Sequence, residues 1–216
     1  MNPLQSIPAG AVIQFNGNDL SNWRSREGGS ADWTVKDGVM TVVPGAGDIA
    51  TLARFTDFQM HLEFRLPDMA EATGQAKANS GVYLQGRYEI QVLDSFGLNI
   101  PGKGDCGAIY DQFAPLVNAN RRPMEWQTYD VVFRAPRVDT KGEVVEHARV
   151  SLTFNGQVIQ NNTQLTGPTG GAIDHDLGTA GPLLLQDHGH LISYRNIWVV
   201  ELPLEGSGTY EPRQST

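Results

Sequence analysis

The run from Tyr88 to Ser95 carries the side chains with the clearest chemistry. Alternation along a β-strand puts Glu89 and Gln91 on one face. One extra residue at Val92-Leu93, a β-bulge, would bring Asp94 to that face as well. Two carboxylates and an amide along one groove are groups that cleavage of a glycosidic bond commonly uses. The plainer alternative is a strand with an exposed polar row.

A second polar run lies just upstream, from Asn79 to Gly86. A short Gly-Arg connection joins it to the first run, so we expect the two strands to be antiparallel neighbours. Asn79, together with Tyr83 or Gln85, would then face the same groove. Amides both donate and accept hydrogen bonds, as sugar hydroxyls require, and an aromatic ring covers the apolar face of a pyranose. Lys77 either guards the entrance or is a solvated loop lysine.

A third polar cluster follows an apolar run near the C-terminus. It comprises Gln186, Asp187 and His188. His188 is a candidate general acid or base near neutral pH, and Asp187 is a candidate to orient it. A divalent metal bound by these groups with Glu63 or Glu89 stays open, because no histidine spacing here specifies a metal site. A plain turn is the other alternative.

Glu63 and Arg195 complete the charged candidates. In the run from Phe58 to Leu66, alternate residues form an apolar row and a polar row, and Glu63 belongs to the polar row. Arg195 interrupts a strand-like run, where it would bind a carboxylate or sugar oxygens, or pair with an acid such as Glu63. The remaining histidines have no local partner pattern and are interpreted as incidental: His61, His147 and His175.

Strands must position these groups, because helical periodicity is scarce in the chain. Short alternating or apolar runs recur between clusters of Gly, Pro, Asn and Asp, which predicts a single all-β domain. Tight turns are predicted at Lys36-Asp37-Gly38 and Asn155-Gly156. We expect the three long connections to rim one opening; they span residues 67–77, 95–123 and 161–181.

Composition limits the function classes further. The chain has 216 residues, of which 40% are hydrophobic, enough for one large sandwich. Its formal charge of -8 disfavours nucleic acid as a partner, and no window approaches the roughly 20 apolar residues of a membrane span. The single cysteine, Cys106, excludes an intrachain disulfide. No secretory signal is visible at the N-terminus, and the oligomeric state stays open.

Eight segments, in this order, resemble the 3-keto-disaccharide hydrolase family. They are F-N-G-x-D-L-x-x-W from Phe15, W-x-V-x-D-G-x-M from Trp33, F-x-x-x-L-E-F-R from Phe58, N-S-G-V-Y-L from Asn79, Y-E-I-Q-V-L-D-S from Tyr88, G-A-I-Y from Gly107, L-Q-D-H-G from Leu185 and Y-R-N-I-W-V from Tyr194. The resemblance runs from Phe15 to Leu202, so we expect one domain over residues 1–203 and a tail over 204–216. The run from Tyr88 also resembles the E-x-D-x-x-E strand of retaining jelly-roll glucanases, with Gln91 and Asp94 at two changed positions.

The resemblance implies a jelly-roll sandwich of two antiparallel sheets, of the concanavalin A-like lectin and glucanase type. It implies a small carbohydrate substrate already oxidised to a ketone at C3, either a 3-keto-disaccharide or a 3-keto-glucoside. A base would remove the C2 proton, the enolate would expel the C1 substituent, and water would add. Family members are often exported, which implies a periplasmic or secreted protein, with the cytoplasm as the alternative.

The resemblance also implies roles for the candidate residues. The base or acid candidates are Glu89, Asp94 and Glu63, and the candidates to stabilise the enolate are His188, Lys77, Arg195 or a metal. The remaining substrate-binding candidates are Asn79, Tyr83, Gln91, Tyr110, Gln186 and Asp187. The rival hypotheses are a non-catalytic carbohydrate-binding module of the same fold and a structural domain, neither of which needs three acids converging in one groove.

Overall fold

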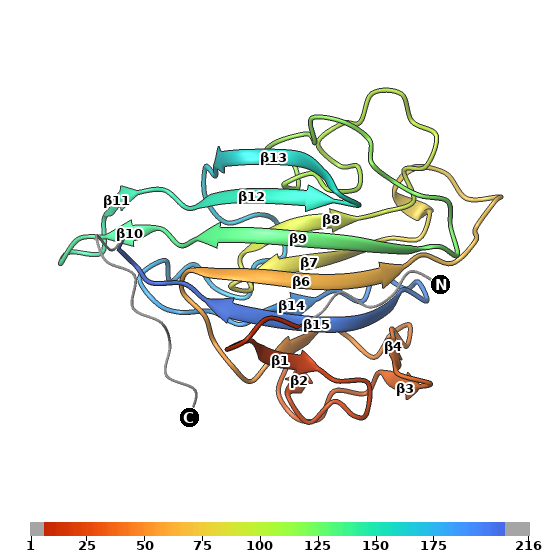
Figure 1. Cartoon of the computed structure of the whole chain (residues 1–216), viewed down its shortest axis with the longest axis horizontal. Helices are drawn as coiled ribbons and strands as arrows, with labels where there is room; N and C mark the ends of the chain where they lie inside the picture. Colours follow the sequence, from red (N-terminus) through yellow and green to blue (C-terminus); the bar gives the residue numbers. More distant parts are fainter. Residues whose placement is uncertain (1–6, 206–216) are drawn as a thin grey trace.

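The computed structural model describes residues 7–205, which form two stacked antiparallel sheets (Figure 1). The larger sheet has the order β13-β12-β9-β6-β15-β4-β3, with β1 also paired to β15. Its strands are β1 (Val12–Phe15), β3 (Thr34–Lys36), β4 (Val39–Thr41), β6 (Phe58–Arg65), β9 (Trp126–Arg134), β12 (Arg149–Phe154), β13 (Gln157–Gln164) and β15 (Ser193–Glu201). The prediction of an all-β sandwich is confirmed.

The smaller sheet has five strands in the order β2-β5-β14-β7-β8. Its members are β2 (Trp23–Ser25), β5 (Ile49–Thr51), β7 (Ser80–Leu84), β8 (Tyr88–Val92) and β14 (Leu184–Leu185). Strands β7 and β8 pair antiparallel, as their short connection predicts. The short strand β14 lies between β5 and β7, which brings the polar residues after it next to β7. The remaining elements are the ribbon β10 (Arg137–Val138) with β11 (Val144–Glu146), and the 3-10 turn η1 (Gly74–Ala76).

The hydrophobic core lies between the two sheets. The predicted apolar row of β6 is fully buried in it: Phe58, Met60, Leu62, Phe64 and Leu66. The smaller sheet contributes Val82, Ile90 and Val92 to the same core. Because side chains alternate along a strand, the residues between these ones face outward from their own sheet. The sandwich therefore has two opposite outer faces on which polar side chains can gather.

Two hairpins confirm the predicted tight turns. Between β3 and β4, Asp37 and Gly38 both have positive φ, at 52° and 78°. Between β12 and β13, Asn155 and Gly156 have φ of 49° and 84°. Two successive residues with positive φ are the geometry of a type I′ turn, whose twist matches that of the paired strands.

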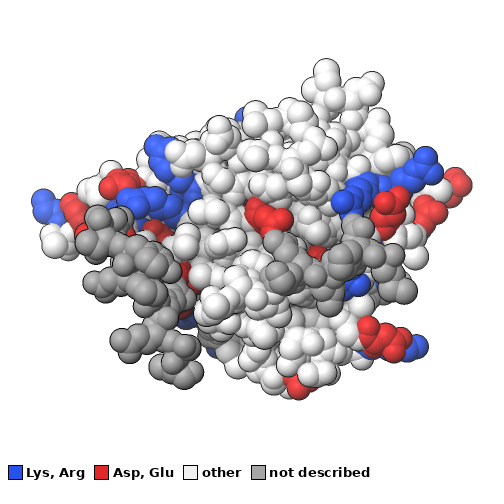
Figure 2. All heavy atoms as spheres, in the orientation of Figure 1, with Lys and Arg blue, Asp and Glu red and all other residues white. Residues whose placement is uncertain are grey.

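Figure 2 shows the molecule from the side of the larger sheet. Charged side chains gather toward the two ends of the strands on this face, and most of the visible surface between them is uncharged. At the end next to β10 and β11, opposite charges pair: Arg134 contacts Glu146 at 2.7 Å and Arg137 contacts Asp57 at 2.6 Å. No helix among residues 7–205 is long and apolar enough to cross a membrane. The expected C-terminal tail lies, beyond Glu205, outside the described residues.

Candidate active site

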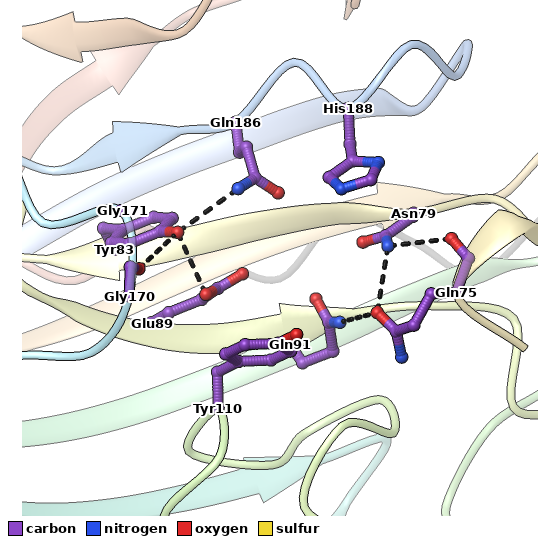
Figure 3. A pocket seen from close by; sticks show the side chains of 10 residues that line it. All are labelled: Gln75, Asn79, Tyr83, Glu89, Gln91, Tyr110, Gly170, Gly171, Gln186 and His188. Atoms are coloured by element: carbon purple, nitrogen blue, oxygen red, sulfur yellow. Dashed lines mark hydrogen bonds between the residues drawn. The ribbon is translucent and has the colours of Figure 1, made fainter.

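A cavity of about 140 Å³ opens on the outer face of the smaller sheet (Figure 3). Its lining consists of Gln75, Asn79, Tyr83, Glu89, Gln91, Tyr110, Gly170, Gly171, Gln186 and His188. Strands β7 and β8 form its floor, and each of the three long connections contributes to its wall. The prediction that these connections rim one opening is confirmed.

Glu89 projects from β8 into this cavity, with a side chain that is almost wholly buried. Its Oε2 accepts a hydrogen bond of 2.9 Å from the Tyr83 hydroxyl, while Oε1 accepts none from the described residues. Burial raises the pKa of Glu89 to about 7, against the opposing effect of the Tyr83 bond and with a small upward contribution from Asp48. Near neutral pH this carboxyl group can therefore accept and return a proton.

A glycine on the neighbouring strand makes room for this carboxylate. At Gly81 an added Cβ would overlap Oε1 of Glu89 and lie 2.9 Å from Cε2 of Tyr83. Real Cβ atoms do not approach heavy atoms so closely, so any larger residue here would displace the carboxylate or the ring. Close packing against Glu89 and Tyr83 thus explains why the N-S-G-V-Y-L motif has a glycine at this position.

Tyr83 connects the carboxylate to the cavity wall. Its hydroxyl lies 2.9 Å from Oε2 of Glu89 and 3.0 Å from the carbonyl oxygen of Gly170. It also accepts a hydrogen bond of 3.2 Å from Nε2 of Gln186. Burial and the nearby Glu89 charge raise the pKa of Tyr83 far above its usual range, so the phenol stays protonated.

Three amide side chains form the opposite wall. Nδ2 of Asn79 donates to the carbonyl oxygen and Oε1 of Gln75, at 2.9 and 3.1 Å. Nε2 of Gln91 donates to the same Oε1 at 3.0 Å and to the Gly104 carbonyl at 3.3 Å. These bonds fix the amide orientations and leave Oδ1 of Asn79 directed toward the cavity as an acceptor (Figure 3).

His188 stands exposed at the mouth of the cavity. Its ring stacks on His190, with centroids 6.2 Å apart and planes at 11°. Nδ1 of His190 accepts a hydrogen bond of 3.1 Å from the backbone N–H of Asn79, which ties the histidine loop to the start of β7. The imidazole of His188 is therefore held at the opening of the cavity.

Asp187 does not orient His188, contrary to the prediction. Its Oδ2 accepts hydrogen bonds from the backbone N–H groups of Gly45 and Gly47, at 2.7 and 2.9 Å, and Oδ1 accepts one from Gly189 at 2.9 Å. The carboxylate therefore fixes two neighbouring loops. It does not line the cavity.

Asp94 does not join Glu89 in the cavity, contrary to the prediction that both line one groove. Strand β8 pairs with β7 in regular register up to Val92 and ends there, at the position where the β-bulge was expected. Beyond that point Oδ2 of Asp94 lies 2.9 Å from Nζ of Lys77, and Oδ1 accepts a hydrogen bond from the Phe96 N–H at 3.1 Å. Asp94 and Lys77 therefore neutralise each other, and neither lines the cavity.

Glu63 also fails to converge with Glu89. It lies on β6 between the core residues Leu62 and Phe64, so it faces the outer side of the larger sheet. There its Oε2 accepts a hydrogen bond of 2.7 Å from Nε of Arg195 and forms an ion pair of 2.7 Å with Nη2 of the same residue. The alternative in which Arg195 pairs with Glu63 is confirmed, and Arg195 as a ligand of the same sugar is wrong.

The polar row of β6 is buried rather than solvent-facing at two positions, His61 and Glu63. Nδ1 of His61 lies 2.7 Å from Oδ1 of Asp130, so this histidine has a defined partner and is not incidental. The partner was hidden from the sequence because Asp130 belongs to β9, which pairs with β6 only in the folded sheet.

The sequence did not point to Gln75, Gly170 or Gly171, which lie in long connections without a periodic pattern. Only the length of those connections signalled that they matter. The candidates that do line the cavity are Glu89, Asn79, Tyr83, Gln91, Tyr110, Gln186 and His188. For the metal alternative, no three His, Cys, Asp or Glu side chains within residues 7–205 come close enough to share an ion.

Comparisons with known proteins agree with this architecture. A Parabacteroides distasonis protein described as a "putative glycosyl hydrolase" is 44% identical, with a TM-score of 0.84 over 90% of this chain and 85% of that chain. Two further proteins of the same description and organism are each 22% identical and share the fold, with TM-scores of 0.66 and 0.61; they cover 90% and 89% of this chain, and 94% and 99% of their own. No curated protein sequence matches.

The model of a protein family matches most of the chain. It is described as the 3-keto-alpha-glucoside-1,2-lyase-like domain, and the match covers residues 10–200. Except for Glu201 at the end of β15, this range contains both sheets, and it contains every residue that lines the cavity. By this match, the chain belongs to the family of 3-keto-alpha-glucoside-1,2-lyase-like domains.

Proposed function

We propose that this protein cleaves 3-keto-glycosides in the cavity on the smaller sheet, with Glu89 as the base that removes the C2 proton. The observation that carries the proposal is the one carboxylate that lines the cavity among the described residues, Glu89, whose pKa is raised to about 7 by burial. The family description and the 44% identical relative, described as a glycosyl hydrolase, support a carbohydrate substrate.

One carboxylate is too few for ordinary glycoside hydrolysis. That reaction uses two carboxyl groups, about 5–5.5 Å apart in retaining enzymes and about 6.5–9.5 Å apart in inverting ones. Within residues 7–205, the other two acid candidates are neutralised elsewhere, Glu63 by Arg195 and Asp94 by Lys77. A substrate that already carries a C3 ketone does not need the second acid, because the ketone acidifies its C2 hydrogen.

The proposed reaction has two stages. First the C2–H bond breaks and its proton passes to Glu89; the resulting enolate re-forms the ketone as the C1–O bond breaks, which leaves a double bond between C1 and C2. The departing aglycone takes up a proton, for which His188 at the mouth is the candidate donor. In the second stage water adds its oxygen to C1 and C2 regains a proton, which gives net hydrolysis.

The other cavity residues are proposed to position the sugar. Nε2 of Gln186 uses one N–H for Tyr83, and its second N–H is available to the C3 oxygen as negative charge develops there. Oδ1 of Asn79 can accept from a sugar hydroxyl. The cavity lining contains no lysine or arginine, so the arrangement suits a neutral sugar ring rather than a uronic acid.

The proposal is tested by incubating the purified protein with a 3-keto-glucoside and with the matching unoxidised glucoside, each with and without a chelator. We expect aglycone release from the keto substrate only, and its loss in Glu89→Gln. Tight binding of the sugar without turnover would replace the proposal by the carbohydrate-binding module, and turnover of the unoxidised glucoside would replace it by a conventional glucanase. The chelator arm decides whether a metal takes part.

A further inference from the structure

The hydroxyl of Tyr83 has more acceptors than it has protons. Oε2 of Glu89 and the carbonyl oxygen of Gly170 lie at 2.9 and 3.0 Å from it, and both can only accept while Glu89 is ionised. Nε2 of Gln186 donates a hydrogen bond of 3.2 Å to the hydroxyl oxygen, so Gln186 does not compete for the hydroxyl proton. A phenol carries a single proton, so at any moment one of the two acceptors goes without it.

The protein holds both acceptors in place. The turn that carries the Gly170 carbonyl is tied down by Arg26, which donates to the carbonyl oxygens of Gly171 and Ala172 at 2.9 and 3.1 Å. Thr169, in the same turn, accepts a hydrogen bond of 2.9 Å at Oγ1 from the Glu89 N–H. The second acceptor therefore remains within reach whichever one Tyr83 serves.

Gly171 makes the close approach of this turn to Tyr83 feasible. Its φ is +78°, and an added Cβ would lie 2.6 Å from the Tyr83 hydroxyl. Together with Gly81 on the other side, it encloses the Tyr83 ring and the Glu89 carboxylate between two glycines. The tyrosine hydroxyl has little freedom except to rotate its O–H bond.

We propose that Tyr83 is a positioning residue whose hydroxyl donates to Glu89 while that carboxylate is ionised, and to the Gly170 carbonyl once Glu89 has taken up the substrate proton. The inference rests on the proposed function for its role in turnover. A hydrogen bond to a carboxylate is stronger than one to a neutral carbonyl, so the ionised state holds the donor. Protonation removes that advantage, and the hydroxyl then satisfies Gly170.

This exchange would serve both stages of the reaction. Before proton transfer, the bond from Tyr83 stabilises the charged base and fixes which of its oxygens faces the substrate. After transfer, the released hydroxyl strengthens the cavity wall at Gly170 and leaves the proton on Glu89 for return to C2. No covalent bond changes at Tyr83, so the exchange needs no further reactant.

The charged groups around Glu89 are few. Asp48 raises its pKa slightly and is itself paired with Arg26 at 3.0 Å. His188 lines the same cavity and is itself ionisable, so it must be controlled for in any titration. Tyr110 also lines the cavity, and its side chain has no hydrogen bond to the described residues.

The first test follows the tyrosine ring directly by NMR, in protein labelled with ¹³C at Cζ of its 6 tyrosines. Tyr83→Phe and Tyr110→Phe assign the two cavity signals. We expect the Tyr83 signal to titrate with a midpoint at about 7, the pKa of Glu89, to become flat in Glu89→Gln and to keep titrating in His188→Gln. A flat signal in the unsubstituted protein, or a titration that survives Glu89→Gln, would overturn the inference.

The second test uses the pH profile of turnover of a 3-keto-glucoside. Without the phenol the charged form of Glu89 loses a donor, so its pKa rises and the acidic limb of the profile moves to higher pH in Tyr83→Phe. Tyr110→Phe is the matched control. The acidic limb of its pH profile should keep the original midpoint, even if the substitution changes the rate of turnover. An unmoved limb in Tyr83→Phe contradicts the inference. Absence of turnover in the unsubstituted protein, with the NMR titration intact, contradicts the proposed function alone.

Discussion

Glu63 and Glu89 occupy corresponding places on the two sheets and have opposite surroundings. Each alternates with core residues on its strand and each is buried, Glu63 at 4% exposure and Glu89 also at 4%. Glu63 accepts hydrogen bonds from Arg195 and from Nδ2 of Asn196 at 2.9 Å. Among residues 7–205, the only side-chain hydrogen bond that the Glu89 carboxylate accepts comes from the neutral phenol of Tyr83. Burial alone therefore does not make a carboxylate reactive; the missing cation does.

The two pKa values diverge for this reason. Burial pushes both upward, but hydrogen bonds from His61, Asn196 and Arg195 reverse the shift at Glu63 and leave its pKa below the usual value. At Glu89 burial prevails and the pKa is raised to about 7. One face of the sandwich thus holds a structural ion pair whose carboxylate favours its charged form, and the other holds a carboxyl group that can exchange a proton near neutral pH.

The largest expected difference between the two acids is in turnover. Glu89→Gln removes the base and should lower kcat for a 3-keto-glucoside about a thousandfold, a typical effect of losing a general base. Glu63→Gln should leave kcat within about threefold, because Glu63 lies on the opposite face and contacts no cavity residue. Steady-state kinetics of the two variants measures this difference. Similar losses of kcat in both variants would contradict a catalytic role for Glu89 that Glu63 lacks.

The second difference is in stability, and it depends on pH. The pKa of Glu89 is raised from 4.5 to about 7 in the folded protein, so folding favours its protonated form and stability falls as pH rises between these values. At pH 8 this penalty amounts to about 3 kcal/mol. Glu89→Gln removes it, so the variant should melt several degrees above the unsubstituted protein at pH 8 and at nearly the same temperature at pH 4. Calorimetry at the two pH values checks this, and a lower melting temperature at pH 8 would contradict it.

A smaller effect is expected from the glycine that makes room for Glu89. Gly81→Ala should displace the carboxylate and lower kcat about 10- to 100-fold, since small misplacements of a catalytic group are costly. The matched control is Gly102→Ala, where the nearest atom to the new Cβ is at 3.4 Å and φ is unremarkable. Kinetics and a melting curve for each variant separate lost positioning from lost folding, and an active Gly81→Ala would refute the close packing described for Glu89.

The smallest expected effect is the stability of Glu63→Gln. This substitution leaves Arg195 without its charged partner and should destabilise the fold by about 1–2 kcal/mol at pH 8, the opposite sign to Glu89→Gln. The pKa of Glu63 is lowered in the folded state, so its stabilisation is present above the unfolded value and fades as pH falls. Urea unfolding at pH 8 and at pH 3 measures both, and a constant difference between the two pH values would argue against the charge as the cause.

Much of the cavity floor could be predicted from the sequence because it rests on strand alternation. The alternation in Tyr88–Val92 puts Glu89 and Gln91 on one face, and the short connection makes β7 and β8 neighbours. The apolar row of β6 and the two type I′ turns follow from equally local patterns. These features depend on residues that are close in the chain, so the sequence is sufficient for them.

The errors have one physical origin. Alternation separates inward from outward side chains, but a sandwich has two outer faces, and the pattern of β6 does not say which one Glu63 joins. The position of the Asp94 side chain depends on where β8 ends, and its ion-pair partner Lys77 belongs to a loop. Gln75 reaches the cavity through the single turn η1, which no periodicity announces. The positions of Glu63, Asp94 and Gln75 are each determined by contacts between segments that are distant in the sequence.

The central claim, that Glu89 removes the C2 proton, is tested most directly by a kinetic isotope effect. The measurement compares turnover of a 3-keto-glucoside carrying hydrogen at C2 with that of the same compound carrying deuterium there. We expect slower turnover of the deuterated compound, because the C2–H bond must break before the C1–O bond does. Equal rates for the two compounds, together with aglycone release that continues undiminished in Glu89→Gln, would contradict it.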